Sequence, residues 1–400
     1  MKNHSCQIAI AGAGIAGLTA ALAFARHGFA IRIFERSAQL GEVGAGVQLS
    51  SNATRLLDRL GVLNAVEQDA VRPEAIELRR ATSGRLIASV PLGAAAQRRW
   101  GAPYLSVHRA DLHAALAKAV QAHPSISLET EAGVSGAVLM PGGGVSLRVE
   151  KDGATETVLC DLAIGADGVR SALRATGRLA RPDRFSGFVA WRATATPQTC
   201  GNLIPPDKVS AFLHPRFHLI AYPVRGGEIV NLVVIARMAA PERTGGGAYR
   251  AMLPPSVIKG ASDEIDALAA ELDTWLPWPI NEVDPDAPWV EPAGLALIGD
   301  AAHAMGPYAA QGAVMAIEDA AALAAIVAAR SHDLAGALTH FEAVRRERVR
   351  QVLRRGAFNR FVWHAAGPVA IGRDVVLALR RPESLVADFD WLYNYDAETL

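Results

Sequence analysis

Cysteine is scarce in this sequence, and an excess of charge of one sign is absent. The three cysteines among 400 residues, Cys6, Cys160 and Cys200, form no CxxC pair and no Cys/His cluster with metal-ligand spacing. We therefore expect no disulfide framework and no metal site, and the free thiols predict a cytoplasmic protein. Lys and Arg together number 40, as do Asp and Glu. The basic excess typical of proteins that bind nucleic acid or an anionic membrane is missing, so neither partner is expected.

The chain also lacks internal repeats, low-complexity segments and long linkers. Half of its residues are hydrophobic and 20% are charged, which is near the average for globular proteins and argues against extensive disorder or a coiled coil. A length of 400 residues exceeds one ordinary hydrophobic core. Two or three domains are therefore expected.

One long run of apolar residues and glycines is present, from Ile8 to Ala25. A signal peptide or a membrane helix would show such a run. The run contains Gly12, Gly14 and Gly17, however, and each glycine weakens a helix by about 1 kcal/mol relative to alanine. We interpret the run as a buried strand, a tight turn and a helix.

The turn has the spacing of a dinucleotide-binding fingerprint. Gly12-Ala13-Gly14-Ile15-Ala16-Gly17 fits G-x-G-x-x-G between a strand over residues 7–11 and a helix over 18–27, and Glu35 ends a second strand over 30–34. Gly12 permits the turn, Gly14 lets a pyrophosphate approach the helix N-terminus, and Gly17 lets the helix pack on the sheet. Glu35 can accept hydrogen bonds from a ribose 2′-hydroxyl.

Segments typical of β-structure separate the dinucleotide-type segments. Alternating residues and turn signals predict antiparallel strands in 75–90 and 126–159, and residues 185–238 are again rich in β-formers. Short buried strands are expected at 161–164 and 294–298, and helices at 111–123 and from 309 to about 355. The order predicts an α/β fold with α+β insertions, in which a Rossmann-like domain is interleaved with a β-sheet domain and followed by C-terminal helices.

Further motifs extend the pattern over the chain. They are Gly165-Ala166-Asp167-Gly168, Gly299-Asp300-Ala301-Ala302-His303, Gly306-Pro307-Tyr308-Ala309-Ala310-Gln311-Gly312, His108-Arg109-Ala110-Asp111-Leu112, Ala190-Trp191-Arg192 and Trp391-Leu392-Tyr393-Asn394-Tyr395-Asp396-Ala397. With the fingerprint, they resemble the single-component flavoprotein aromatic hydroxylases over nearly the whole chain. This family of FAD monooxygenases includes salicylate, 3-hydroxybenzoate and 6-hydroxynicotinate hydroxylases.

The resemblance implies a division into three parts. The FAD-binding domain is expected to comprise residues 1–74, 101–125, 155–180 and 286–365. The substrate-binding β-sheet domain is expected to comprise residues 75–100 and 181–285, and residues 366–400 a C-terminal helical tail.

The resemblance also assigns cofactor contacts. Asp300 matches the residue that binds the flavin ribityl hydroxyls, Arg109 an arginine that contacts FAD, and Asp167 a residue near the pyrophosphate. The segment Gly44-Ala45-Gly46-Val47-Gln48 resembles the loop beside the isoalloxazine, and free N–H groups at Gln311-Gly312 can stabilise negative charge on reduced flavin. The expected FAD-binding set is Gly12, Gly14, Ala16, Gly17, Glu35, Arg36, Gly46, Val47, Arg109, Asp167, Asp300, Pro307, Gln311 and Gly312. Two alternatives stay open: Asp167 can cap a turn, and Arg192 can serve either in an ion pair or as a substrate ligand.

The implied chemistry is hydroxylation of an electron-rich ring. In the family, NAD(P)H reduces FAD, O2 adds at flavin C4a, and the hydroperoxide transfers a hydroxyl group to the substrate. Removing a phenolic proton activates the ring, so a base with a pKa near neutral is useful. His218 and Tyr222 lie four residues apart in a predicted strand and should face one cavity. Members acting on hydroxybenzoate and hydroxynicotinate carry a similar pair, so we expect both residues to be catalytic.

The substrate is expected to be a small phenolic or pyridine-type carboxylic acid. Gln48 stands where the 6-hydroxynicotinate type carries histidine, and Pro307 where the 3-hydroxybenzoate type carries glutamine, so neither substrate transfers directly. No second glycine fingerprint is present for NADH or NADPH, which is expected to dock transiently. A monomer or homodimer is expected. The alternatives are a related halogenase, epoxidase or reductase, or a non-catalytic FAD-binding regulator.

Overall fold

The apolar N-terminal run forms a strand, a turn and a helix. The structure is a computed structural model that describes residues 7–41, 46–240 and 251–399. Strand β1 spans Gln7–Ala11, helix α1 spans Ile15–Arg26 and strand β2 spans Ala30–Phe34. The two strands have their predicted bounds, whereas the helix begins three residues earlier than predicted because Gly14 is its N-cap. Most of the run is buried inside the protein.

A six-stranded sheet surrounds β1. Its order is β17 (Val290–Glu291), β18 (Leu295–Leu297), β11 (Leu162–Gly165), β1, β2 and β7 (Ile126–Glu129). All neighbouring strands are parallel except β17 and β18. The prediction of antiparallel strands throughout 126–159 was therefore wrong for β7, because helix α5 (Arg109–Gln121) precedes β7, and a helical crossover delivers a strand parallel to its neighbours.

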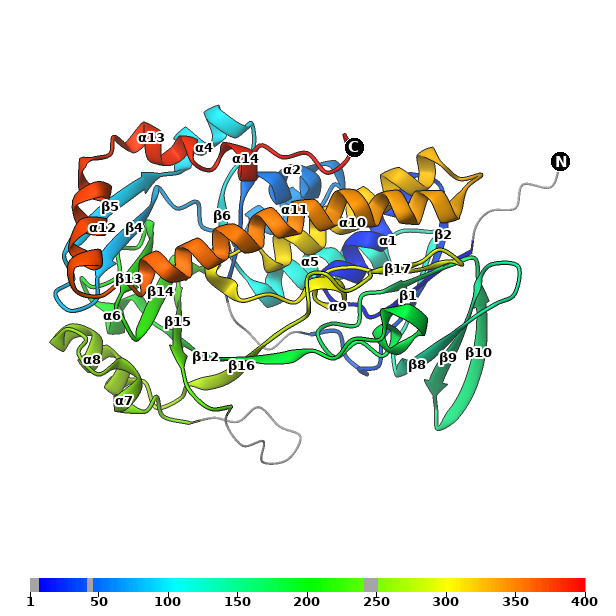
Figure 1. Ribbon diagram of the computed structural model, residues 1–400, viewed down its shortest axis with the longest axis horizontal. Helices are drawn as coiled ribbons and strands as arrows, with labels where there is room; N and C mark the ends of the chain where they lie inside the picture. The colour runs from blue at the N-terminus through cyan, green and yellow to red at the C-terminus, as the bar shows by residue number, and fades with distance from the viewer. Residues whose placement is uncertain (1–6, 42–45, 241–250, 400) are drawn as a thin grey trace.

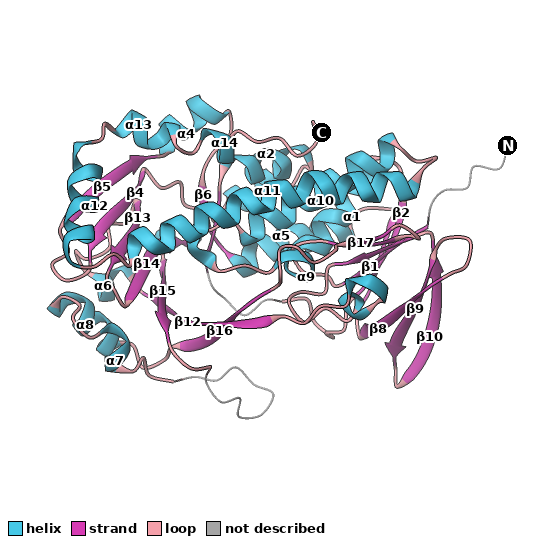
Figure 2. Ribbon diagram, in the orientation of Figure 1, coloured by secondary structure: helices cyan, strands magenta, loops and turns pink. Residues whose placement is uncertain are grey.

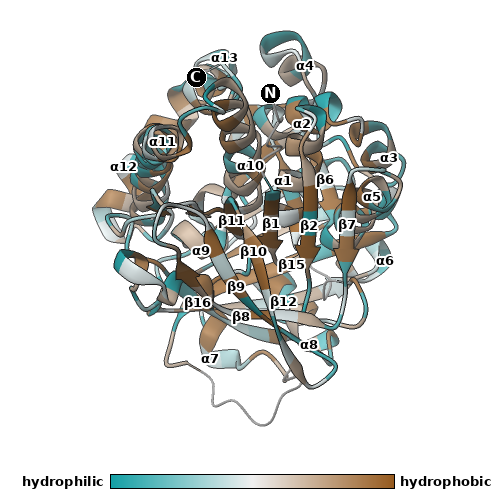
Figure 3. Cartoon of the chain, turned by 90° about the vertical axis from the view of Figure 1, so that its right-hand side faces the viewer, coloured by the Kyte–Doolittle hydropathy of each residue, from teal (hydrophilic) through white to brown (hydrophobic). Residues whose placement is uncertain are grey.

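Two layers cover this parallel sheet. Helices α1, α5 and α10 (Gly312–Ala329) pack together on one side. On the other side lies an antiparallel sheet of β8 (Ala132–Leu139), β9 (Val145–Lys151) and β10 (Ala154–Cys160), which contacts β1, β2 and β11. The hydrophobic strands β1, β2 and β11 lie between these layers (Figure 3).

A seven-stranded sheet forms the second half of the molecule (Figure 2). Its order is β16 (Leu276–Glu282), β12 (Arg184–Ala195), β15 (Ile229–Arg237), β14 (Phe217–Val224), β13 (Lys208–Leu213), β4 (Ala75–Arg80) and β5 (Leu86–Pro91). Chain segments of this sheet alternate in sequence with those of the parallel sheet, which confirms the interleaved fold. The domain bounds given above stay a prediction.

One long helix connects the two halves. Helix α11 (Leu334–Trp363) runs along the molecule from the parallel sheet to the seven-stranded sheet (Figure 1). It packs on α10, which among the described helices is by itself long and apolar enough to cross a membrane. Because 72% of α10 is buried inside the protein, its place is that of a core helix.

The remaining elements are short. They are β3 (Gly46–Leu49), β6 (Leu105–His108), α2 (Ser51–Arg59), α3 (Leu63–Glu67), α4 (Gly93–Trp100), α6 (Pro197–Cys200), α7 (Pro255–Ile258), α8 (Asp263–Glu271), α9 (Asp300–His303), α12 (Gly367–Leu379), α13 (Pro382–Ala387), α14 (Asp390–Tyr393), and the 3-10 turns η1 (Leu173–Ala175), η2 (Gly177–Leu179), η3 (Arg225–Gly227) and η4 (Pro307–Ala309).

Candidate active site

A cavity of about 1460 Å³ lies between the two large sheets and is closed on one side by α11 and α12. Single small-molecule sites usually measure about 300–1,000 Å³. The volume therefore leaves room for a large cofactor together with a second small ligand.

The glycine fingerprint forms one end of the cavity. Gly12 has φ +100°, and a Cβ there would lie 2.6 Å from the carbonyl oxygen of Ala166. A Cβ at Gly17 would lie 1.9 Å from the carbonyl oxygen of Gly12, so only glycine lets α1 approach the turn this closely. Gly12, Gly14 and Ala16 line the cavity. Gly14 caps α1 without a side chain, which leaves the first N–H groups of the helix available to an anion.

Glu35 lies beside this turn, after β2. Its Oε2 accepts a hydrogen bond from the Ala13 N–H (2.8 Å) and its Oε1 accepts one from the Ser37 N–H (2.9 Å). Each carboxylate oxygen can accept more than one hydrogen bond. Glu35 therefore supports the turn. Because it lines the cavity together with Arg36, its carboxylate can also accept a hydrogen bond from a ribose hydroxyl.

Asp167 serves as a cap and also reaches the cavity. Its Oδ2 accepts hydrogen bonds from the N–H groups of Ala172 (2.7 Å) and Leu173 (3.3 Å). Its Oδ1 is buried and has no partner among the described residues, and burial raises the pKa of this carboxyl. The turn-capping role that the sequence left open is present, and the residue also belongs to the cavity lining.

Asp300 and Arg109 line the cavity from two different helices, α9 and α5. Asp300 is the first residue of α9 and follows Gly299, which has φ +58°. Arg109 begins α5; burial lowers its pKa, while the nearby charge of Asp300 acts in the opposite direction. A carboxylate and a guanidinium thus lie close enough to interact beside the fingerprint.

Most of the expected isoalloxazine contacts belong to the cavity lining. The lining includes Gly46, Val47, Pro307 and Gly312. Two residues of the expected loop, Gly44 and Ala45, lie outside the described residues. Gln311 does not line the cavity: its side chain is buried, and its Nε2 donates to Ser50 Oγ (3.1 Å). Only the backbone of Gln311, at the start of α10, remains a candidate ligand.

The two expected catalytic residues occupy different positions on β14. Tyr222 lines the cavity and lies against Gly46, where a Cβ would be 2.5 Å from Tyr222 Cε2. His218 is fully buried on the same face of the strand and packs against the rings of Tyr308 and Trp363, which line the cavity. The expectation that both side chains form the cavity wall therefore holds for Tyr222 alone.

His218 is paired with a second histidine from the end of α11. Its Nδ1 lies 3.0 Å from Nε2 of His364, while its own Nε2 is buried and has no partner among the described residues. Burial, with the neighbouring His364, lowers the pKa of His218 well below the usual histidine value. His218 is therefore neutral near pH 7. The sequence did not indicate His364, because only the fold brings it to β14.

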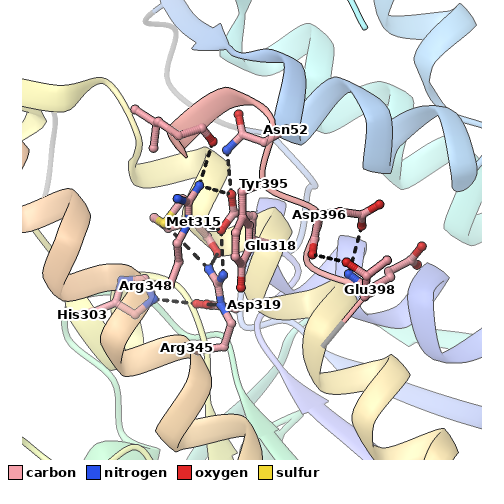
Figure 4. A network of polar contacts seen from close by, with 12 residues as sticks. Asn52, His303, Met315, Glu318, Asp319, Arg345, Arg348, Tyr395, Asp396 and Glu398 are labelled. Carbon is pink, nitrogen blue, oxygen red and sulfur yellow. Dashed lines mark hydrogen bonds and ion pairs between the residues drawn. The ribbon is translucent and has the colours of Figure 1, made fainter. Parts of the chain in front are cut away.

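A buried ionic network behind the cavity was also missed by the sequence (Figure 4). Asp319 Oδ2 accepts from the Gly299 N–H (2.9 Å) and lies 2.5 Å from Nε2 of His303, and Arg345 donates to Asp319 Oδ1 (2.8 Å). Burial alone would raise the pKa of Asp319, but the charges of His303 and Arg345 together lower it. Glu318-Asp319 inside the apolar helix α10 was the available signal.

The polar groups of the cavity fit FAD better than a metal ion. The glycine turn and the free α1 N-terminus suit a pyrophosphate, and Glu35, Arg109 and Asp300 are placed along the wall that continues from it. Across the described residues, no group of three or more His, Cys, Asp or Glu side chains could hold a metal ion.

Comparisons with known proteins agree with this geometry. A family model described as an FAD binding domain matches residues 5–356. The 3-hydroxybenzoate 6-hydroxylase of Polaromonas naphthalenivorans (strain CJ2) is 31% identical over 402 residues, covering 97% of this chain and 96% of the relative. The 3-amino-4-hydroxybenzoate 2-monooxygenase PtnB3 of Streptomyces platensis is 34% identical over 401 residues, covering 99% of this chain and 98% of the relative. Klebsiella pneumoniae HpxO, solved with FAD and uric acid, has a TM-score of 0.80 at 24% identity and covers 97% of this chain and 96% of its own.

Proposed function

The chain belongs to the FAD-dependent aromatic monooxygenase family, and from this premise we propose that it uses NAD(P)H and O2 to hydroxylate a small phenolic, aminophenolic or hydroxypyridine carboxylic acid. The two relatives named above act on 3-hydroxybenzoate and 3-amino-4-hydroxybenzoate. Bound FAD supplies electron transfer from NAD(P)H and the activation of O2. The protein must hold the ring in place and keep water away from it.

The observation that carries the proposal is the wall that the seven-stranded sheet gives to the cavity. It is mostly apolar and includes Ile220, Val233 and Ile235. Polar side chains on this wall are Arg192, Tyr222 and Asn281. An apolar wall with a few polar groups suits a flat aromatic ligand that must be oriented and kept dry.

We propose that FAD occupies the half of the cavity formed by the parallel sheet. The pyrophosphate would lie at the glycine turn and the adenosine ribose at Glu35, with Arg36 beside it. Asp167, Arg109 and Asp300 would hold the middle of the cofactor. The ring system would reach Gly46, Val47, Pro307 and the start of α10 at Gly312, next to the sheet that carries Tyr222.

Tyr222 is the proposed hydrogen-bonding partner of the substrate hydroxyl. Burial raises the pKa of Tyr222 far above the ordinary tyrosine value, so its hydroxyl stays protonated and can donate. A donor at this position favours the ionised form of the substrate hydroxyl, which is the more electron-rich form of the ring.

We propose that His218 accepts the proton of the substrate hydroxyl. Because His218 lies behind the cavity wall and not in it, the proton must reach it through an intervening group. In the pair of neutral imidazoles, one of the two facing nitrogens donates and the other accepts, so a proton that reaches His218 can leave through the half-buried His364. His218→Gln should lower the hydroxylation rate about 10²-fold or more, most strongly below the pKa of the substrate hydroxyl. Unchanged hydroxylation and coupling from pH 6 to pH 9 would reject this role.

The experiment that tests the proposed function uses the purified, FAD-loaded protein. Hydroxybenzoates, aminohydroxybenzoates and hydroxypyridine carboxylates would each be supplied with NADH and with NADPH, while product mass and hydrogen peroxide are measured. Our proposal predicts a product one oxygen heavier for at least one acid. A chlorinated or epoxidised product, or peroxide alone with every acid, would favour a related flavoenzyme activity instead. We also propose a cytoplasmic location, transient docking of the nicotinamide nucleotide, and a monomer or homodimer.

A further inference from the structure

Arg192 is placed where it can contact a ligand in the cavity. It lies on β12, opposite Val233 on β15, and Val233 lies opposite Ile220 on β14. All three side chains line the cavity, so they share one face of the sheet. Tyr222 is on the same face, two strands away and two residues further along. Strand spacing of about 4.8 Å and a rise of about 3.4 Å per residue separate the Cα atoms of Arg192 and Tyr222 by roughly 12 Å.

Arg192 is half-buried and, unlike the buried arginines Arg345 and Arg348, donates no hydrogen bond to a carboxylate within the part of the chain that the structure describes. Arg345 donates to Glu318 and Asp319, and Arg348 donates to Glu318 and to two backbone carbonyls. Over the described ranges of the chain, Arg192 has no hydrogen bond or ion pair, and its guanidinium lies 5.3 Å from the centre of the Trp278 ring. Its five N–H donors thus stay available on the cavity side.

The surroundings of Arg192 favour an anion. Burial, followed by the positive charge of Arg109, lowers the pKa of Arg192 to about 10, so the side chain remains a cation at neutral pH. The negative charge of Asp300 offsets part of this effect, and an anionic ligand that hydrogen-bonds the half-buried guanidinium would stabilise it further. The guanidinium lies over the Trp278 ring, and its planar set of N–H donors suits two parallel hydrogen bonds to a carboxylate.

We propose that Arg192 binds the carboxylate of the aromatic substrate and that the Tyr222 hydroxyl donates a hydrogen bond to the ring hydroxyl of the same substrate. The two side chains would span the ring from opposite ends across the apolar surface of Val233 and Ile220. This inference rests on the proposed function and adds to it that an ionised acid group is a requirement for binding. Arenes that lack the acid are rejected because they leave Arg192 without a partner.

The test compares matched ligands on FAD-loaded enzyme. Dissociation constants for 3-hydroxybenzoate and 3-hydroxybenzamide, and for 3-amino-4-hydroxybenzoate and its amide, would be measured from the change in flavin absorbance. The parent protein should prefer each acid to its amide. Arg192→Met should weaken binding of the acids by about 10- to 100-fold and leave the amides unchanged, and Arg192→Lys should recover part of the loss.

Arg184→Met is the matched control, because Arg184 lies on the same strand but is exposed and outside the cavity lining. It should bind acids as the parent does. Equal loss of acid and amide binding in Arg192→Met, or loss of FAD, would overturn the inference, as would a parent that binds amides as tightly as acids.

Failure of the proposed function gives a different result, since no arene of the panel would then be hydroxylated by the parent. If arene acids are hydroxylated and Arg192→Met keeps the acid preference, only the role of Arg192 is wrong.

Discussion

At the scale of single residues, the site depends on glycines, which have no side chain, as well as on polar side chains. Gly12, Gly17 and Glu35 had a local sequence signal, because their spacing alone defines a strand, a turn and a helix. The cavity position of Tyr222 followed from strand alternation. The direction of Gln311 had no such signal, since it is set by Ser50, which lies 261 residues away in sequence.

Gly46 offers a residue-scale prediction. A Cβ at Gly46 would lie 2.5 Å from Tyr222 Cε2, and the Tyr222 ring is buried, so Gly46→Ala should displace this ring. Loss of one hydrogen bond of about 1 kcal/mol should raise KM for the aromatic acid about 5- to 10-fold. Because Gly46 also lines the part of the cavity proposed for the flavin ring, the FAD content of the variant is measured alongside KM. Steady-state kinetics and flavin absorbance measure both quantities.

Gly136→Ala is the control for this substitution, because a Cβ at Gly136 on β8 would meet no atom within 4 Å. It should leave KM unchanged. If Gly46→Ala and Gly136→Ala have the same kinetics, the contact between Gly46 and Tyr222 does not position the substrate.

At the scale of elements, the helices and strands were largely predictable but their junctions were not. Periodicity indicated β1, β2, α5 and the long C-terminal helices, since each has its own hydrophobic pattern. The pairing of His218 with His364 joins β14 to the end of α11 across 146 residues. The network of Asp319 joins α9, α10 and α11 in the same way, and no pattern within one element specifies such contacts.

The buried network predicts a large difference between two arginines of α11. Arg345 is 0% exposed and pairs with Glu318 and Asp319. Arg345→Met would remove the cation that two buried carboxylates share, leaving Glu318 with Arg348 and Asp319 with His303, and should lower the free energy of unfolding by about 3–5 kcal/mol. Because Asp319 also holds the Gly299 N–H beside Asp300, FAD affinity should fall as well.

Arg350→Met supplies the comparison on the same helix. Arg350 pairs with Asp286 at the surface, where the two side chains are 40% and 70% exposed. Its loss should leave the free energy of unfolding nearly unchanged, because solvent screens an exposed ion pair. Chemical denaturation and FAD titration of both variants would measure the difference, and equal stability of the two would contradict a structural role for the buried network.

The histidine pair predicts a pH dependence of stability. Burial lowers the pKa of His364 to about 4, and the charges of Arg360 and His214 act in the same direction. The folded protein therefore binds fewer protons at this ring than the unfolded chain, whose histidine pKa is about 6.5. The stabilisation is complete above about pH 6.5 and decreases as the pH falls toward 4.

His364→Gln removes this titration. Its melting temperature should fall less between pH 7 and pH 5 than that of the parent, because the other ionisable groups are common to both proteins. Thermal unfolding at both pH values measures the effect. Parallel curves for the two proteins would show that His364 is protonated equally in the folded and unfolded states.

At the scale of the whole molecule, two interleaved sheets surround one cavity. The parallel sheet supplies the glycine turn and acids expected at a dinucleotide, and the seven-stranded sheet supplies an apolar wall with Tyr222 and Arg192. The sequence indicated the interleaving because dinucleotide-type and β-rich segments alternate along it. It did not indicate which polar side chains face the cavity, since that depends on how seven strands are registered against one another.

The proposed reaction inserts one oxygen atom from O2 into an aromatic acid bound in this cavity. The most direct measurement is product mass after a reaction with ¹⁸O2, NAD(P)H and the preferred acid of the panel, using FAD-loaded enzyme. We expect a hydroxylated product that carries one ¹⁸O atom, formed in proportion to the NAD(P)H consumed. A product whose new oxygen comes from water, or NAD(P)H consumption that yields hydrogen peroxide without product for every acid, would contradict it.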